Sequence, residues 1–299
     1  MGKSAITLNR QIAVEPLGPG RYCSAMNPTA MGTLAPTAFG GNVLAVAVSA
    51  LYQTVSASHH IYSVCGHFVN AATTDRLLIC DVEIIKNTKA FQTRQVRVTQ
   101  ETDNGLTRLC LLASADFHIE ESRSMVTYSL PPQTAINPSS ASTQRTQAEE
   151  YGLYKHIERF TDTQPIIVDT NDKKDVSPAG APLKVSADKF KALGPLQNEP
   201  EQMAALAFYM DRGLAHIPAK HSGCELFEAS ACASLDFALR FFTHEINLHN
   251  WQTMELKTLV AENARAFGEA RVWDEKGHLL ASMTQQTLLR PLPDFKPRM

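Results

Sequence analysis

Apolar and polar residues alternate along two similar stretches of the chain, and each stretch is interrupted by turn residues. In the first half, the stretch from Gln95 to Ser114 is broken by Asp103-Asn104-Gly105. In the second half, the stretch from Ala270 to Ser282 is broken by Asp274-Glu275-Lys276-Gly277. Extended runs on both sides of a glycine-bearing turn are typical of a β-hairpin, so we predict one hairpin in each half.

Each predicted hairpin is preceded by another extended run and, before that, by a mostly apolar helical pattern. The extended runs are Leu77–Ile85 and Thr253–Val260, and the helical patterns are Asn42–Val55 and Pro200–Ile217. A sheet with one apolar face has to be covered, and a central apolar helix can cover it. The repetition of this unit predicts an α+β fold of two tandem domains, each with a long central helix wrapped by an antiparallel sheet.

The boundary between the two domains is expected at residues 131–150. This segment contains three prolines, many Ser, Thr and Gln residues and almost no large apolar residue, which is the composition of a linker. We therefore place an N-terminal domain at residues 1–130 and a C-terminal domain at residues 151–299. The same reasoning predicts a second loop from Asp169 to Pro182.

Composition narrows the class of protein. Of the 299 residues, 44% are hydrophobic, which excludes a disordered chain. Lys and Arg number 28 and Asp and Glu number 30, so the net charge is −2. A nearly neutral chain lacks the electrostatic footprint of a nucleic-acid-binding protein, and we expect no nucleic-acid partner. The most apolar stretch, Val43–Tyr52, is too short to cross a membrane.

Cysteine usage and the chain ends indicate the compartment. The six cysteines show no Cys-x-x-Cys spacing, so we expect buried thiols in a reducing compartment. The first residues do not form the basic-then-apolar pattern of a signal peptide. We expect a cytoplasmic protein. The peroxisome is the alternative, because Pro297-Arg298-Met299 weakly resembles a C-terminal peroxisomal targeting signal.

A carboxylate interrupts the apolar pattern of the second predicted helix. Asp211 borders the apolar stripe, whereas Arg212 is expected to point away from it. The stripe consists of Met203, Leu206, Ala207, Met210 and Leu214. Burial raises the pKa of a carboxyl group, which suits a general base, but a boundary Asp that meets a loop or a lysine fits the same pattern.

A second polar residue stands on an apolar face of the last predicted strand. Between Leu279 and Arg290 the residues alternate, and Gln285 shares its face with Met283 and Ala281. A buried amide must find partners, and it can donate and accept hydrogen bonds at once. Both a structural and a functional amide fit this position.

No pattern of metal ligands or cofactor-binding motifs is present. His216 and His221, and likewise His244 and His249, are five residues apart without a matching acidic or cysteine cluster. The chain also lacks a dinucleotide fingerprint, a phosphate-binding loop and a Gly-x-Ser-x-Gly nucleophile elbow. We therefore expect no metal and no cofactor.

Five blocks of sequence resemble the acyl-CoA thioesterase II family, in the family's order and spacing. The resemblance runs from about Ile6 to Pro291 and is interrupted by the predicted linker. The blocks are Phe39-Gly40-Gly41; Asp81-Val82-Glu83 with Phe91, Arg94, Val96 and Gln100 after it; Tyr209-Met210-Asp211; Ser234-Leu235-Asp236; and Ala281-Ser282-Met283-Thr284-Gln285, ending at Arg290.

The resemblance implies a double hotdog fold and a water-mediated hydrolysis of an acyl-CoA thioester. It implies Asp211 as the general base, with Ser234 and Gln285 helping to hold the water. Phe39, Gly40 and Gly41 open the first helix, where backbone N–H groups can bind a substrate oxyanion or where glycines only allow tight helix–sheet packing. Strict alternation along the strand groups Ser234 opposite Phe237, so we expect Ser234 to face away from its own domain's core.

Three departures from the family pattern concern the expected acyl pocket. Phe237 stands where the family usually has His, and the strand from Tyr62 to Phe68 has Cys65 and His67 in place of a His-Ser-x-His pattern. Thr88-Lys89 replaces a glycine shortly before Phe91. The resemblance therefore implies a pocket that differs from that of an ordinary fatty acyl-CoA thioesterase.

The leading prediction is a thioester hydrolase that releases a carboxylic acid and coenzyme A from an acyl-CoA. The alternatives are an enzyme for a specialised thioester, such as a polyketide or carrier-bound acyl group, and a non-catalytic acyl-binding hotdog protein. A hotdog hydratase is disfavoured, because no His lies beside an Asp on the expected helix. Exposed sheet edges would favour a homo-oligomer.

Overall fold

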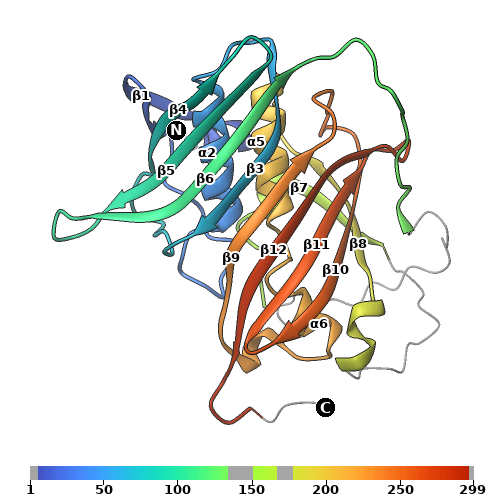
Figure 1. Cartoon of the computed structure of the whole chain (residues 1–299). Helices are drawn as coiled ribbons and strands as arrows, with labels where there is room; N and C mark the ends of the chain where they lie inside the picture. Colours follow the sequence, from blue (N-terminus) through green and yellow to red (C-terminus); the bar gives the residue numbers. More distant parts are fainter. Residues whose placement is uncertain (1–5, 134–150, 167–177, 296–299) are drawn as a thin grey trace.

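The computed structural model describes residues 6–133, 151–166 and 178–295 (Figure 1). The predicted linker lies outside the described residues from position 134 onward, and so do most of the predicted second loop and Pro297-Arg298-Met299. The proposed domain boundaries at 130 and 151 flank this linker.

The first half of the chain contains one long helix and six strands. The predicted helix at 42–55 begins and ends slightly earlier, as α2. In chain order the elements are α1 (Leu8–Ile12), β1 (Val14–Gly18), β2 (Arg21–Ser24), α2 (Gly40–Tyr52), β3 (His59–Phe68), β4 (Ile79–Asn87), β5 (Phe91–Glu101) and β6 (Thr107–Ile119). The predicted hairpin is the β5–β6 pair.

In its described residues, the second half repeats this plan with one long helix and six strands. Its predicted hairpin is the β11–β12 pair. In chain order the elements are η1 (Glu158–Phe160), β7 (Thr161–Ile166), η2 (Pro178–Leu183), β8 (Ser186–Ala192), α5 (Glu199–Met210), α6 (Ile217–His221), η3 (Leu226–Glu228), β9 (Ala229–Phe241), β10 (Gln252–Glu262), β11 (Arg265–Trp273) and β12 (Leu279–Pro291).

The strands of the described residues form one 12-stranded antiparallel sheet that runs through both halves (Figure 1). The strand order is β1-β2-β4-β5-β6-β3-β9-β12-β11-β10-β8-β7, so each half contributes six neighbouring strands. The halves join where β3 pairs with β9, with Ser63 opposite Arg240 and His67 opposite Asp236. The predicted architecture of two tandem units, each with a central helix wrapped by antiparallel strands, is confirmed.

The two central helices pack against each other in antiparallel directions inside the curved sheet (Figure 1). At one end, the Tyr52 hydroxyl donates to Glu199 Oε1 at 2.9 Å, which joins the end of α2 to the start of α5. At the other end, a Cβ placed on Gly41 would lie 2.4 Å from the carbonyl oxygen of Phe208. Only glycine therefore allows the start of α2 to approach the last turn of α5 so closely.

The second predicted helix, 200–217, is wrong in its extent. Helix α5 ends at Met210, and Asp211 is its C-cap residue. The chain turns at Gly213, whose φ is +110°, and a Cβ there would lie 2.9 Å from Leu256. The expectation that Arg212 points away is also wrong, because its side chain is buried and donates to Thr163 Oγ1 at 3.2 Å and to Asp188.

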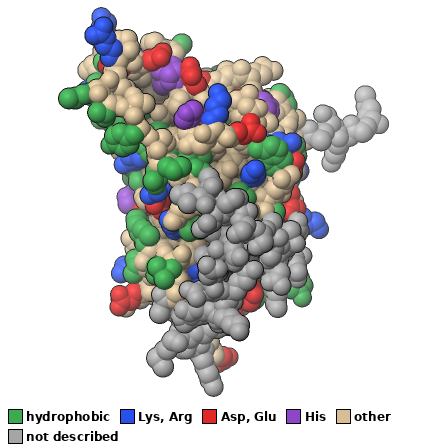
Figure 2. Space-filling model, turned by 90° about the vertical axis from the view of Figure 1, so that its right-hand side faces the viewer, with side chains coloured by type: hydrophobic (Ala, Val, Ile, Leu, Met, Phe, Trp, Pro, Cys, Tyr) green, Lys and Arg blue, Asp and Glu red, His purple; other side chains and the backbone are tan. Residues whose placement is uncertain are grey.

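The surface carries charges of both signs. On the face shown in Figure 2, outside its grey area, the blue and red side chains are interspersed and do not separate by sign. No helix in the described part of the chain combines the length and the apolar character that crossing a bilayer requires.

All six cysteines are free thiols, but only Cys80 and Cys110 are buried, so the expectation of buried thiols is wrong for the other four.

The contact between the two helices can be tested by Gly41→Ala. The added methyl group collides with backbone of α5, so we expect a loss of about 1–3 kcal/mol of unfolding free energy, measured by urea denaturation. Gly18→Ala is the matched control, because no described atom lies within 4 Å of a Cβ at that position. Equal midpoints for the two variants would contradict the close approach.

Candidate active site

The structure brings together the three polar residues that the sequence separates by up to 74 positions. Gln285 Nε2 donates to Asp211 Oδ1 at 2.7 Å, and the Ser234 hydroxyl lies 3.5 Å from the same oxygen. Asp211 is 7% exposed and Gln285 is fully buried. A carboxylate with two donors on one oxygen keeps its second oxygen for another partner.

Asp211 and Gln285 owe their positions to the ends and the alternation of regular elements. Asp211 follows the last turn of α5, a helix that is buried on nearly all sides. Gln285 lies in the middle of β12, on the face that also carries buried Met283 and Ala281, as the alternation predicted. The register of β12 against its neighbours thus aims the amide at the end of α5.

Ser234 reaches the site because a β-bulge reverses the expected alternation of β9. Gln285 is paired with Phe237 and Gln286 with Asp236, but Thr287 is paired with Ser234, so Leu235 is an extra residue. Directly paired residues share a face, and Thr287 is buried. Ser234 therefore faces the same side as Gln285, and the expectation that it faces away from its domain's core is wrong.

The predicted Phe39-Gly40-Gly41 segment lies beside the carboxylate. Phe39 is the N-cap residue of α2, and a Cβ on Gly40 would lie 2.6 Å from Asp211 Oδ2 and 3.2 Å from the Phe68 ring. A glycine at position 40 is thus needed for the helix N-terminus to meet the carboxylate. Gly41 provides close helix–helix packing rather than helix–sheet packing.

Burial and hydrogen bonding act on the Asp211 carboxyl group in opposite directions. Burial raises its pKa because the ionised form loses its hydration. Hydrogen bonds from Gln285, from the backbone N–H of Gly41 and from Ser234 lower the pKa, but they offset only part of this effect. The net pKa is raised to about 6, which leaves a carboxylate at neutral pH that still has an affinity for protons.

A cavity of about 330 Å³ opens onto the carboxylate at the junction of the two halves. Asp211 and Ser234 line it from the second half, and Gly40, Val43 and Phe68 line it from the first. Gln285 is not among the described residues that line the cavity, so it holds the carboxylate from behind. Most of the lining is apolar or small, which suits an apolar ligand with one reactive polar group at its end.

Two of the three departures from the family pattern differ in their relation to this cavity. Phe237 is buried and its ring packs on that of Phe68, with centroids 5.3 Å apart. Cys65 and His67, in contrast, are not among the described residues that line the cavity, and the Cys65 thiol accepts from Arg240 at 2.9 Å. Of these residues, Phe237 therefore changes the surroundings of the site most directly.

Several lining residues were missed by the sequence reasoning because they lie in irregular segments. They come from residues 31–38, before α2, and from residues 69–72, after β3. Neither segment has a period that would identify an inward face. The described residues contain no cluster of three or more His, Cys, Asp or Glu side chains placed to hold a metal ion.

Each half of the chain matches a protein-family model. Residues 27–118 match the acyl-CoA thioesterase N-terminal domain, and residues 137–289 match the acyl-CoA thioesterase C-terminal domain. The two matches follow each other in the order of the two halves of the sheet.

Solved structures share the fold at low sequence identity. An acyl-CoA thioesterase II, TesB2, from Mycobacterium marinum has 18% identity and a TM-score of 0.73, over 97% of this chain and 99% of its own. A tesB protein of Mycobacterium avium subs paratuberculosis has 17% identity and a TM-score of 0.72, over 95% and 98%. A hotdog-fold protein from Alicyclobacillus acidocaldarius has 15% identity and a TM-score of 0.68, over 95% and 98%. With its tandem N- and C-terminal domains and double hotdog fold, the chain belongs to the acyl-CoA thioesterase family, a family of thioester hydrolases.

Proposed function

We propose that the protein hydrolyses an acyl-CoA thioester to a free carboxylic acid and coenzyme A, with Asp211 as the general base. Ser234 helps to hold the attacking water, and Gln285 fixes the carboxylate. The observation that carries the proposal is the Asp211 carboxyl group. It is buried, is held at 2.7 Å by Gln285 and lies on the wall of a cavity beside a helix N-terminus.

The reaction begins with a water bound between the Asp211 carboxylate and the Ser234 hydroxyl. Asp211 takes a proton from this water as its oxygen attacks the carbonyl carbon of the thioester. The carbonyl π electrons move to the oxygen and give a tetrahedral oxyanion. When the oxyanion collapses, the carbon–sulfur bond breaks, and the proton on Asp211 passes to the departing sulfur. The products are the free acid and the coenzyme A thiol.

The N-terminus of α2 supplies the positive end of a dipole to this reaction. The first N–H groups of a helix have no acceptor within the helix, and the helix dipole favours negative charge there. Within Phe39-Gly40-Gly41 we assign the oxyanion to the backbone N–H of Gly40, a residue that lines the cavity. The Phe39 N–H donates to the Thr29 carbonyl oxygen at 2.8 Å, and the Gly41 N–H donates to Asp211. The apolar lining beyond it holds the acyl chain.

Replacement of the proposed base tests the mechanism. In an assay of free thiol release from a panel of acyl-CoAs, Asp211→Asn should lower kcat by about 10²–10⁴-fold, because the amide cannot accept the proton from water. The control is Asp236→Asn, an acid on the neighbouring strand segment whose paired residue is Gln286. Full activity of folded Asp211→Asn protein would remove Asp211 from the mechanism.

The raised pKa of Asp211 predicts a pH dependence of the activity. Since the base must be ionised, kcat/KM should rise with pH through an apparent pKa of about 6 and reach a plateau above it. At pH 5 the value should be about tenfold below the plateau. A profile that is flat between pH 5 and 8 for the wild-type enzyme would be incompatible with this base.

The same pKa predicts a pH dependence of the stability. The folded-state pKa, about 6, lies above the unfolded value of 3.8, so the folded state binds more protons between these values. The stabilisation is fully present below pH 3.8 and is lost as the pH rises through about 6. Asp211→Asn should therefore be more stable than wild type by up to about 3 kcal/mol above pH 7, with the difference vanishing below the unfolded pKa of 3.8. Denaturant unfolding at several pH values measures it, and a constant difference would contradict the burial of the charge.

A further inference from the structure

One wall of the active-site cavity is the connection between β3 and β4. Residues Val69, Asn70, Ala71 and Ala72 of this connection line the cavity that Asp211 also lines. These four residues lie outside the named strands and helices. The backbone N–H groups of Val69 and Asn70 still donate to the Cys110 carbonyl oxygen of β6, at 2.9 and 3.4 Å, whereas Ala71 and Ala72 have no such bond to β6 among the described contacts. Their position depends on contacts from elsewhere in the fold.

A buried amide holds the backbone that directly follows the wall, at Thr73 and Arg76. Gln100, near the end of β5, is 2% exposed, and its side chain forms hydrogen bonds with the backbone of Thr73 and Arg76. Gln100 Oε1 accepts from the Thr73 backbone N–H at 2.8 Å, and Gln100 Nε2 donates to the carbonyl oxygens of Thr73 and Arg76, both at 2.9 Å. The amide thus satisfies three backbone groups of the connection.

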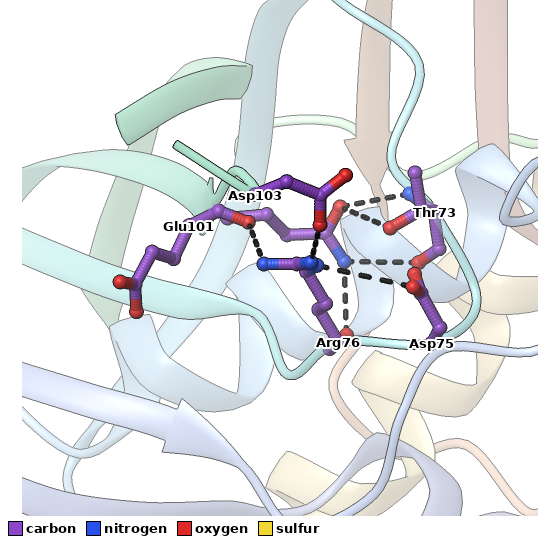
Figure 3. Close-up of polar contacts among 6 residues, drawn as sticks. Thr73, Asp75, Arg76, Glu101 and Asp103 are labelled. Carbon is purple, nitrogen blue, oxygen red and sulfur yellow. Dashed lines mark hydrogen bonds and ion pairs between the residues drawn. The ribbon is translucent and has the colours of Figure 1, made fainter. Parts of the chain in front are cut away.

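Arg76 forms a more exposed shell around the same connection (Figure 3). Its guanidinium donates to the Glu101 carbonyl oxygen at 3.1 Å and pairs with Asp103 and Asp75. The Arg76 side chain is 33% exposed and that of Asp103 is 95% exposed, so water screens this ion pair. The buried amide therefore constrains Thr73 and Arg76 more strongly than the ion pair does.

The connection is also tied to the segment that leads into α2. The Ala38 backbone N–H donates to the Ala72 carbonyl oxygen at 2.8 Å, and Thr37 forms an isolated β-bridge with Thr73. Thr37 and Ala38 line the cavity as well, and Phe39 follows as the N-cap of α2. A displacement of Thr73 therefore moves two adjoining parts of the cavity wall together.

We propose that Gln100 is a positioning residue that sets the acyl-chain specificity of the cavity. This inference rests on the proposed function, because it takes the cavity as the acyl site. An apolar side chain at position 100 leaves three backbone groups without their partner, so the wall must rearrange. Asp211 is held by Ser234 and Gln285 from β9 and β12 and by the Gly41 N–H within α2, and none of these groups belongs to the wall, so the geometry of the base is kept. The rearranged wall therefore alters the binding of the acyl chain.

Gln100→Leu tests the proposal with short, medium and long saturated acyl-CoAs. We expect the ratio of kcat/KM for long to short chains to change by about tenfold, with most of the change in KM and little in kcat for the shortest substrate. Gln100→Glu keeps the acceptor for the Thr73 N–H but, when ionised, cannot donate to the two carbonyl oxygens, and it should show the same shift.

Gln252→Leu is the matched control for a merely structural amide. Gln252 is also 2% exposed and donates to the carbonyl oxygens of Asn247 and Asn250, but no described residue of that connection lines the cavity. Loss of stability alone should lower the activity toward all chain lengths by one factor. Gln252→Leu should therefore leave the ratio between chain lengths unchanged.

The outcomes separate this inference from the proposed function. If Asp211→Asn abolishes hydrolysis but neither Gln100 variant changes the chain-length ratio, the role of Gln100 is wrong and the proposed function stands. The role of Gln100 is equally wrong if both variants fail to fold, judged by circular dichroism, because the amide is then structural. If Asp211→Asn remains fully active, the proposed function fails whatever the Gln100 variants do.

Discussion

The antiparallel packing of α2 against α5 is the constraint on which the site depends. It buries the Asp211 carboxyl group where the C-terminus of one helix meets the N-terminus of the other. The carbonyl end of α5 disfavours a negative charge, and the N–H end of α2 favours it. The effect of burial on the pKa of Asp211 is larger than the opposite effect of its hydrogen bonds, so the pKa rises to about 6. A carboxyl group in this balance is ionised at neutral pH and can still take up a proton.

Neither half of the chain can build this site alone. The second half supplies the carboxylate, the hydroxyl of Ser234 and the amide of Gln285, whereas the first supplies the glycines and the aromatic ring of Phe68. The pairing of β3 with β9 and the contact of Gly41 with Phe208 hold these groups in register. The two halves share one arrangement of helix and strands, but each supplies different parts of one proposed site.

Irregular features of the fold position several of the residues that face the cavity. The extra residue at Leu235 turns Ser234 toward the carboxylate, although the strand pattern alone turns it away. The segments before α2 and after β3 form much of the cavity wall, and the Gln100 amide bonds to the backbone directly after the second of them. Regular strands and helices supply the frame, whereas a bulge, a helix end and a buried amide decide what faces the cavity.

The sequence by itself determined the hairpins, the two apolar helices and the buried face of Gln285, because a period of two or 3.6 residues states which side of an element is apolar. Only the tertiary structure decided that α5 ends at Met210, since the break depends on the fit of Gly213 against Leu256. The burial of Arg212 beside Asp188 and the inward turn of Ser234 were decided in the same way. Periodicity describes one segment at a time, whereas these features arise from contacts between segments that are far apart in the chain.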